Sequence, residues 1–200
     1  IMKYIVSNNR LFTMKGITPI SLEEALDMLF KEPALGFDTE TGGLNCFQSK
    51  LLCSQFGTDK FQILFDHSFV NIQSLKPLLE SNILLVGQNL KFDLRFLYYH
   101  GIVPKNIYDS YLAEILLTNG LQYDHRTLKD IAFKYLGVTL DKSVRGTIIY
   151  KGLTEEVIHY ALADVEHMLP IMEAQMRLIK EFNLERALSL ENSFCRVLAY

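Results

Sequence analysis

Short apolar runs bounded by turn residues dominate the first half of the chain, and apolar residues at helical spacing dominate the second half. Such runs predict strands, and the turn that begins at Gly57 predicts that the two strands beside it form a hairpin. Antiparallel strands, followed by strands that alternate with helices, predict a mixed α/β sheet with helices on both faces. The strands are expected at 3–6, 35–40, 51–57, 61–65, 83–86 and 107–109.

Capping residues and prolines mark the ends of the expected helices. Ser21, with Glu24 three residues later, matches a capping box, and Thr154 precedes two acidic residues as a second candidate N-cap. Gly137 suits the left-handed position after a helix, and Pro170 is expected to kink or interrupt the helix that follows Thr154. Helices are expected over about ten residues after Ser21, at 74–81, 94–100, 111–117 and 127–136, from 155 onward, and at 184–200.

Composition limits the classes of function. A net charge of −3 argues against a surface that is basic overall and binds nucleic acid non-specifically. It allows a local basic groove, or an acidic metal site that recruits phosphate through its ions. Three cysteines in no metal-ligand spacing, with no signal sequence, predict a reducing, cytoplasmic compartment. No apolar run approaches the ~20 residues that span a bilayer, so no membrane partner is expected.

Two acids end the apolar run that begins at Leu35. Asp38 and Glu40 are two residues apart, so on a strand their side chains share one face. A buried strand that ends in two close carboxylates needs a compensating charge, which a hard divalent cation with oxygen ligands supplies. Considered alone, a solvated strand end that runs into a turn is the simpler interpretation, because such triplets are frequent.

Acids recur after a later strand and on a later helix. Asp93 follows a strand, where it either complements a helix dipole or joins a functional site. Tyr160 and Asp164 are four residues apart, so they lie about 40° from each other around a helix, on the face that packs on the sheet. This pair either forms a hydrogen bond within the core or serves a site. Ligand sites in such sheets lie at the carboxyl ends of central strands, where Asp38 and Glu40 fall.

These acids together form a candidate metal site, made of Asp38, Glu40, Asp93 and Asp164. Without metal they would repel one another, and some would stay protonated at neutral pH. With two Mg²⁺ or Mn²⁺ ions roughly 4 Å apart, they would form a site for in-line attack of water on a phosphodiester.

Three motifs resemble, in order and separation, those of the DEDD 3′→5′ exonucleases: Phe37-Asp-Thr-Glu-Thr, Asn89-x-x-x-Asp93 and Tyr160-x-x-x-Asp164. In its tyrosine, the third motif resembles that of the proofreading domain of family A DNA polymerases, which are DNA polymerase I-like. The resemblance implies an RNase H-like fold with a mixed five-stranded sheet. It also implies an exonuclease domain at 2–182 and a helical segment at 183–200 that begins a polymerase domain. His159 fits the histidine form of the third motif, but on a regular helix it lies about 140° from Asp164.

The resemblance further implies a role for each site residue. Asp38 would bridge two Mg²⁺ or Mn²⁺ ions, and Glu40 and Asp164 would complete the first. Asp93 would act on the second through water, and Tyr160 would orient the attacking water. The expected substrate-binding residues are Thr41, Gly42, Leu44, Gln88 and Asn89.

Other residues near the motifs have simpler interpretations. Phe92 and Phe96 are expected in the core, because they have helical spacing. Basic side chains that could line the path of single-stranded nucleic acid are more simply interpreted as part of a solvated protein face. These are Arg126, Lys129, Lys142 and Arg145.

The expected activity is release of nucleoside 5′-monophosphates from the 3′ end of single-stranded DNA, by a monomer that is covalently linked to a polymerase domain. Two alternatives remain open. One is an RNase D-like exoribonuclease, since nothing in the sequence reads the 2′-hydroxyl directly. The other is a catalytically inactive nucleic-acid-binding domain, against which the presence of all four acids and the tyrosine argues.

Overall fold

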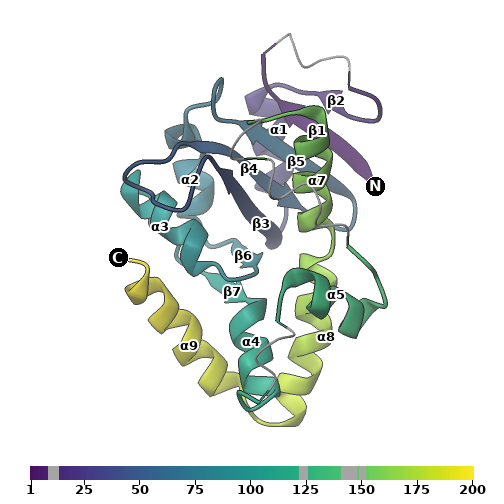
Figure 1. Ribbon diagram of the computed structural model, residues 1–200, viewed down its shortest axis with the longest axis vertical. Helices are drawn as coiled ribbons and strands as arrows, with labels where there is room; N and C mark the ends of the chain where they lie inside the picture. The colour runs from purple at the N-terminus through teal and green to yellow at the C-terminus, as the bar shows by residue number, and fades with distance from the viewer. Residues whose placement is uncertain (9–13, 122–125, 141–147, 149–151) are drawn as a thin grey trace.

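The computed structural model describes residues 1–8, 14–121, 126–140, 148 and 152–200, which form a seven-stranded sheet with helices on both faces (Figure 1). The strand order is β2-β1-β5-β4-β3-β6-β7. β4 pairs antiparallel with β3 and β5, whereas the other pairs are parallel. The strands are β1 (Met2–Val6), β2 (Thr18–Pro19), β3 (Ala34–Thr41), β4 (Leu51–Gly57), β5 (Phe61–Asp66), β6 (Leu84–Gly87) and β7 (Ile107–Asp109).

The mixed α/β architecture and all six strands predicted from the sequence pattern are confirmed, and the sheet has seven strands in place of the five that the resemblance implies. β1 and β2 extend the sheet beyond β5, and β1 pairs with β5 from Met2 opposite Phe61 to Val6 opposite Phe65. β2 has only two residues, so no alternating pattern could reveal it. The hairpin expected at the Gly57 turn is confirmed by the antiparallel pairing of β4 with β5.

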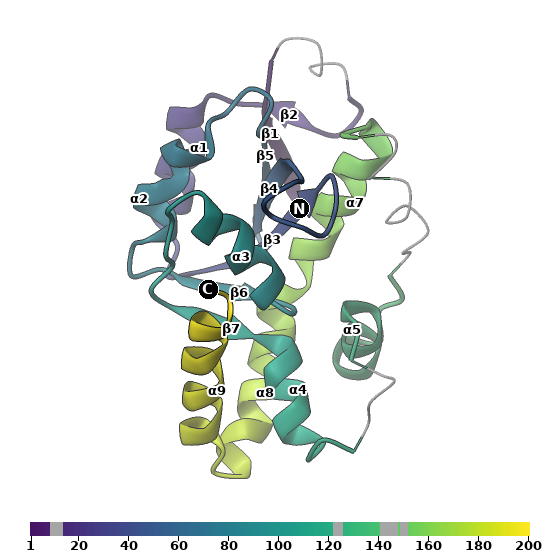
Figure 2. The ribbon, with the colours of Figure 1, turned by 60° about the vertical axis from the view of Figure 1, so that its left-hand side comes forward.

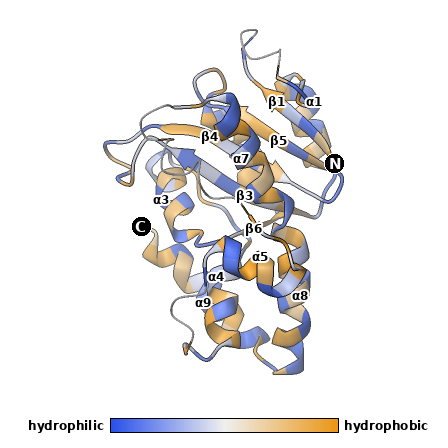
Figure 3. Cartoon of the chain, turned by 45° about the vertical axis from the view of Figure 1, so that its right-hand side comes forward, coloured by the Kyte–Doolittle hydropathy of each residue, from blue (hydrophilic) through white to orange (hydrophobic). Residues whose placement is uncertain are grey.

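Helices cover the two faces of the sheet through separate groups of apolar side chains (Figures 1 and 2). α1, α2 and α3 contribute to a core that includes Phe37, Phe56 and Phe65, whereas α7 packs Ala161 against the other face with Leu64. β4 and β5 are largely hydrophobic, whereas β3 carries hydrophilic segments (Figure 3). The helices are α1 (Leu22–Leu29), η2 (Ile72–Leu75), α2 (Lys76–Leu79), α3 (Lys91–Tyr99), α4 (Ser110–Leu117), α5 (Leu128–Leu136), α7 (Glu155–Glu166), α8 (Met168–Glu181) and α9 (Glu185–Leu198).

The helix ends follow the predicted capping signals. Ser21 caps α1 in a complete capping box, and the Thr154 side chain caps α7. Gly137 ends α5 in the left-handed conformation, with φ of 68°. α7 ends just before α8 begins, so the interruption expected near Pro170 is confirmed. No helix in the described ranges is both long and apolar enough to cross a membrane.

A pair of facing glycines brings α7 directly onto the sheet. Gly36 of β3 lies opposite Gly57 of β4. A Cβ atom on Gly36 would lie 2.7 Å from the carbonyl oxygen of Val165, and one on Gly57 would lie 2.8 Å from it. Because such distances leave no room for a side chain, the last turn of α7 rests on bare backbone. Asp164 is thereby held beside the end of β3.

Candidate active site

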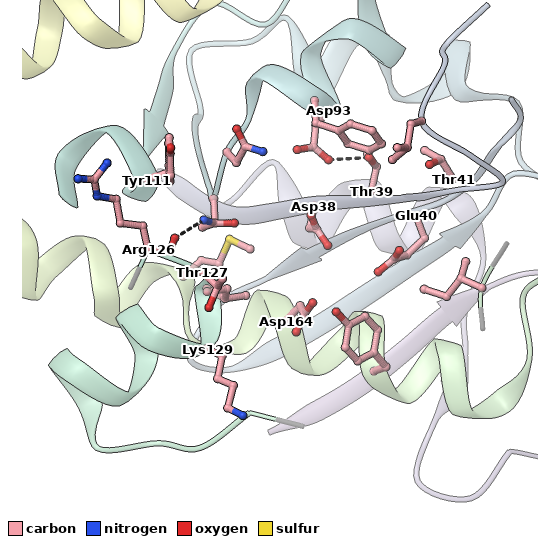
Figure 4. Close-up of a pocket in the computed structure, with 18 of the residues that line it drawn as sticks. Asp38, Thr39, Glu40, Thr41, Asp93, Tyr111, Arg126, Thr127, Lys129 and Asp164 are labelled. Carbon is pink, nitrogen blue, oxygen red and sulfur yellow. Dashed lines mark hydrogen bonds between the residues drawn. The ribbon is translucent and has the colours of Figure 1, made fainter. Parts of the chain in front are cut away.

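Three of the four predicted acids converge at the end of β3. Asp38 and Glu40 project from the same face of this strand, and Asp164 reaches them from α7 (Figure 4). Each carboxylate offers one oxygen, and these three oxygens lie within 4.8 Å of one another. Asp164 is buried, whereas Asp38 and Glu40 are partly exposed to the pocket. The cluster therefore presents oxygen ligands of the kind that hard divalent cations bind.

Asp93 lines the same pocket but lies outside this cluster of three. It occupies the first turn of α3, is 2% exposed, and accepts a 2.5 Å hydrogen bond from the hydroxyl of Thr39 (Figure 4). Burial, together with the negative charge of Asp109, raises the pKa of Asp93 to about 7, although the hydrogen bond from Thr39 acts in the opposite direction. Thr39 alternates with Asp38 and Glu40 along β3, so the strand contacts Asp93 from its other face.

The third motif presents its tyrosine to the pocket. Tyr160 and Asp164 both line the cavity, as their spacing on α7 predicts. His159 does not line it; its ring is 3.8 Å from Glu155 in an exposed i,i+4 pair. The geometry thus supports the tyrosine form of the motif over the histidine form.

Gln55 is a site residue that was not predicted from the sequence. It lies on β4 directly opposite Asp38, and its side-chain amide donates a 2.8 Å hydrogen bond to the Asp38 carboxylate. Gln55 is fully buried, so this bond orients Asp38 from beneath the pocket. A long polar side chain in a mostly apolar strand was the available signal, but its meaning depended on the register of β3 and β4.

Asp109 organises the turn that precedes α3. Its carboxylate accepts hydrogen bonds from the backbone N–H groups of Asn89 and Leu90, both at 2.8 Å, and from Tyr111 at 2.9 Å. Asn89 has φ of 58°, a left-handed conformation that these bonds hold in place. The turn at Asn89, where the second motif begins, is therefore fixed to the end of β7 and the start of α4. α3 starts at Lys91, three residues before the predicted start at 94.

Four of the five expected substrate-binding residues line the pocket, whose volume is about 770 Å³: Thr41, Leu44, Gln88 and Asn89. Leu44 is 79% exposed, so its side chain is not part of the core. Gly42 does not line the pocket, and its N–H group instead donates to the carbonyl of Lys50 across the loop. The Gln88 side chain donates to the carbonyl of Arg126 at 2.8 Å, so it joins the turn before α3 to the segment before α5.

The remaining candidates divide between the pocket and the core. Arg126 and Lys129 line the pocket near α5; Arg126 is buried, whereas Lys129 is exposed, as the simpler interpretation of a solvated face expects. Lys142 and Arg145 lie outside the described residues. Phe96 is buried in the core as expected, and Phe92 packs beside it while also lining the pocket. The lining also includes residues that are not among the site candidates named from the sequence: Thr39, Gly43, Tyr111, Thr127, Leu128, Ile148 and Met168.

The strand order and the carboxylate cluster define an RNase H-like α/β domain with a site suited to divalent metal ions. A family model described as 3′-5′ exonuclease matches residues 17–180, and the chain belongs to this family. The resemblance to the DEDD exonucleases is therefore confirmed, and family membership indicates a hydrolytic nuclease.

Known proteins share parts of this chain or its fold. The chain is 30% identical over 171 residues to DNA polymerase I of Aquifex aeolicus, which covers 82% of this chain but only 27% of that protein's length. The structure of Escherichia coli RNase D, described as an exoribonuclease involved in structured RNA processing, matches with a TM-score of 0.82 at 21% identity, covering 100% of this chain and 51% of the other. Brucella melitensis NrnC with bound Mg²⁺ matches with a TM-score of 0.75 at 18% identity, covering 98% and 90%. At these identities the two structures establish the common fold.

Proposed function

We propose that this protein is a metal-dependent 3′→5′ exonuclease that hydrolyses the terminal phosphodiester of single-stranded or frayed DNA and releases nucleoside 5′-monophosphates. The observation that carries the proposal is the convergence of Asp38, Glu40 and Asp164 within 4.8 Å. Carboxylates from separate elements that gather this closely repel one another unless a cation compensates their charge. Asp93 and Tyr160 in the same pocket complete the residues that the reaction requires.

The carboxylates would hold two Mg²⁺ or Mn²⁺ ions. Asp38 would contact both ions, Glu40 and Asp164 would complete the ligands of one, and Asp93 would act on the other through water. When bound, two such ions lower the pKa of an attacking water and offset the charge that develops on the leaving 3′ oxygen. Gln55 keeps the Asp38 carboxylate oriented through its 2.8 Å hydrogen bond, and so it would act as a positioning residue.

The remaining pocket residues would place the substrate. Tyr160 is only 8% exposed, so packing fixes its ring and its hydroxyl would hold the attacking water in line with the scissile bond. Leu44 projects from the loop after β3 and would pack against the terminal base. Asn89 would bind the sugar–phosphate backbone beside Thr41, on the turn that Asp109 fixes.

We also infer a proofreading role within a longer polymerase. The 30% identity to a DNA polymerase I supports DNA as the substrate and this biological setting. In that arrangement residues 2–182 would be the exonuclease domain, and the segment at 183–200 would lead into a polymerase domain.

Digestion of matched DNA and RNA oligonucleotides tests the proposal. The expected result is release of nucleoside 5′-monophosphates from the 3′ end of single-stranded DNA in Mg²⁺ or Mn²⁺, and no release in EDTA. Faster digestion of RNA than of DNA would instead assign an RNase D-like function. Binding without cleavage in every metal would assign a catalytically inactive nucleic-acid-binding domain.

A further inference from the structure

A second cavity, of about 1050 Å³, adjoins the candidate active site through two shared elements. The first is the loop at 42–50: Leu44 lines the active-site pocket, whereas Phe47 and Lys50 line the second cavity. The second is α3, on which Asp93 lines the active-site pocket and Tyr99, the last residue of the helix, lines the second cavity. The two cavities therefore follow one another along the same loop and the same helix.

Exposed aromatic rings gather around this second cavity. Phe47 is 71% exposed, Phe69 58% and Tyr99 53%. The rings of Phe47 and Tyr99 are in edge contact, with centroids 5.6 Å apart, and Tyr99 contacts His100 at 5.3 Å. Single exposed apolar residues are ordinary, but several large rings around one cavity indicate a binding surface.

The loop that carries Phe47 is held by its own hydrogen bonds. The Asn45 side chain accepts from the N–H group of Phe47 at 3.0 Å, and its carbonyl accepts from Ser49 at 2.8 Å. Cys46 is 4% exposed and anchors the middle of the loop in the main core. With its neighbour anchored, Phe47 is directed outward by the fold, so its exposure is a fixed feature of the loop.

The second cavity lacks the cluster of acids that marks the active site. Among its described lining residues, Asp66 is the only acid, and its carboxylate is buried and accepts hydrogen bonds from Ser7 and Ser68. Lys50 is exposed and lines the cavity with His100. Aromatic rings that stack on bases, combined with a lysine that attracts phosphates, are usual features of a single-strand binding site.

We propose that the second cavity binds unpaired nucleotides of the same strand whose 3′ end lies in the active site. The inference rests on the proposed function, because it requires a nucleic-acid substrate. Tyr99 lies six residues after Asp93 on α3, which is about 9 Å farther along the helix axis and about 120° around it. The axial separation alone equals two to three stacked base steps of about 3.4 Å, so nucleotides upstream of the terminal pair are the ones that reach the cavity.

Substrates of two lengths test the site. With wild-type protein, Phe47→Ala and Tyr99→Ala, the KM and kcat are measured on a single-stranded DNA octamer and on a dinucleotide, which is too short to reach the second cavity. Each alanine variant should raise the KM for the octamer about five- to tenfold and leave kcat and the dinucleotide KM unchanged. Phe47→Tyr and Tyr99→Phe keep the rings and should retain the wild-type KM. Phe182→Ala removes an equally exposed ring outside both cavities and is the matched control.

Two results would overturn the inference: an octamer KM that no alanine variant changes, or an equal loss of activity on octamer and dinucleotide. Binding of the octamer in EDTA, followed by fluorescence anisotropy, separates this inference from the proposed function. If the wild-type protein does not cleave but binds the octamer, and Phe47→Ala weakens that binding, the second site stands and the exonuclease assignment fails. If the wild-type protein cleaves and the variants bind normally, the exonuclease assignment stands and the second site fails.

Discussion

Replacing Gln55 by leucine tests whether β4 supports the proposed metal ligands of β3. The substitution nearly preserves volume in a fully buried position and removes the 2.8 Å hydrogen bond to Asp38. A hydrogen bond to a charged group contributes ~1.5–3 kcal/mol, and the lower figure applies because Asp38 is partly exposed to solvent. A loss of about 1.4 kcal/mol is tenfold in a binding constant. We therefore expect Mn²⁺ affinity to fall about tenfold, at the lower end of the effects of orienting residues around metals.

Isothermal titration with Mn²⁺ measures this effect, and initial rates at increasing Mn²⁺ should show activity recovering as the weakened site fills. Gln62→Leu is a matched control: Gln62 is also fully buried, on β5, and its amide has no hydrogen-bond partner within the described part of the chain. It should bind Mn²⁺ normally and be at least as stable as the wild type, since it replaces a buried amide without a partner. Wild-type Mn²⁺ affinity in Gln55→Leu would refute the orienting role.

Three further predictions concern the site residues themselves. Asp38→Ala should abolish metal-dependent cleavage of a DNA oligonucleotide, followed on a gel, while thermal unfolding stays cooperative. Full cleavage activity in this variant would contradict the metal assignment. Tyr160→Phe should lower kcat about 100-fold with Mn²⁺ affinity largely kept, whereas His159→Ala should be normal; the reverse pattern would transfer the role to His159. Burial raises the pKa of Asp93 to about 7 from 3.8, so the folded state holds the extra proton and the metal-free protein should lose stability as pH rises from about 4 to 7. Urea unfolding across this range should show that slope, and Asp93→Asn should reduce it but not remove it, because burial also raises the pKa of Asp109, to about 6.

Local patterns were sufficient for much of the fold. Ser21, Thr154 and Gly137 act through neighbours within a few residues, so their capping roles could be read from the sequence. The regular helix that follows Thr154 also predicted that Tyr160 faces the same way as Asp164. The sheet could not be predicted as well, because β1 pairs with a strand that lies some 60 positions later.

Contacts between distant elements account for what was missed in the site. Gln55 acquires its role from the register that places it opposite Asp38, and a shift by one residue would turn it to the other face. The turn before α3 depends on the Asp109 carboxylate of β7, whose partners are backbone groups that carry no sequence signal. The approach of α7 depends on Gly36 and Gly57 being opposite each other, which no single strand reveals.

β3 joins the two halves of the site because its side chains alternate. Asp38 and Glu40 face α7, where Asp164 meets them, and Thr39 faces α3, where its hydroxyl bonds to Asp93. Thr41 continues the second face and donates to the Gly43 carbonyl at 2.7 Å, which ties the strand to the loop that leads toward the second cavity. A shift in the register of β3 would exchange these two faces, so metal ligands, the fourth acid and the loop would be displaced together. The register of one strand therefore sets the geometry of the whole site.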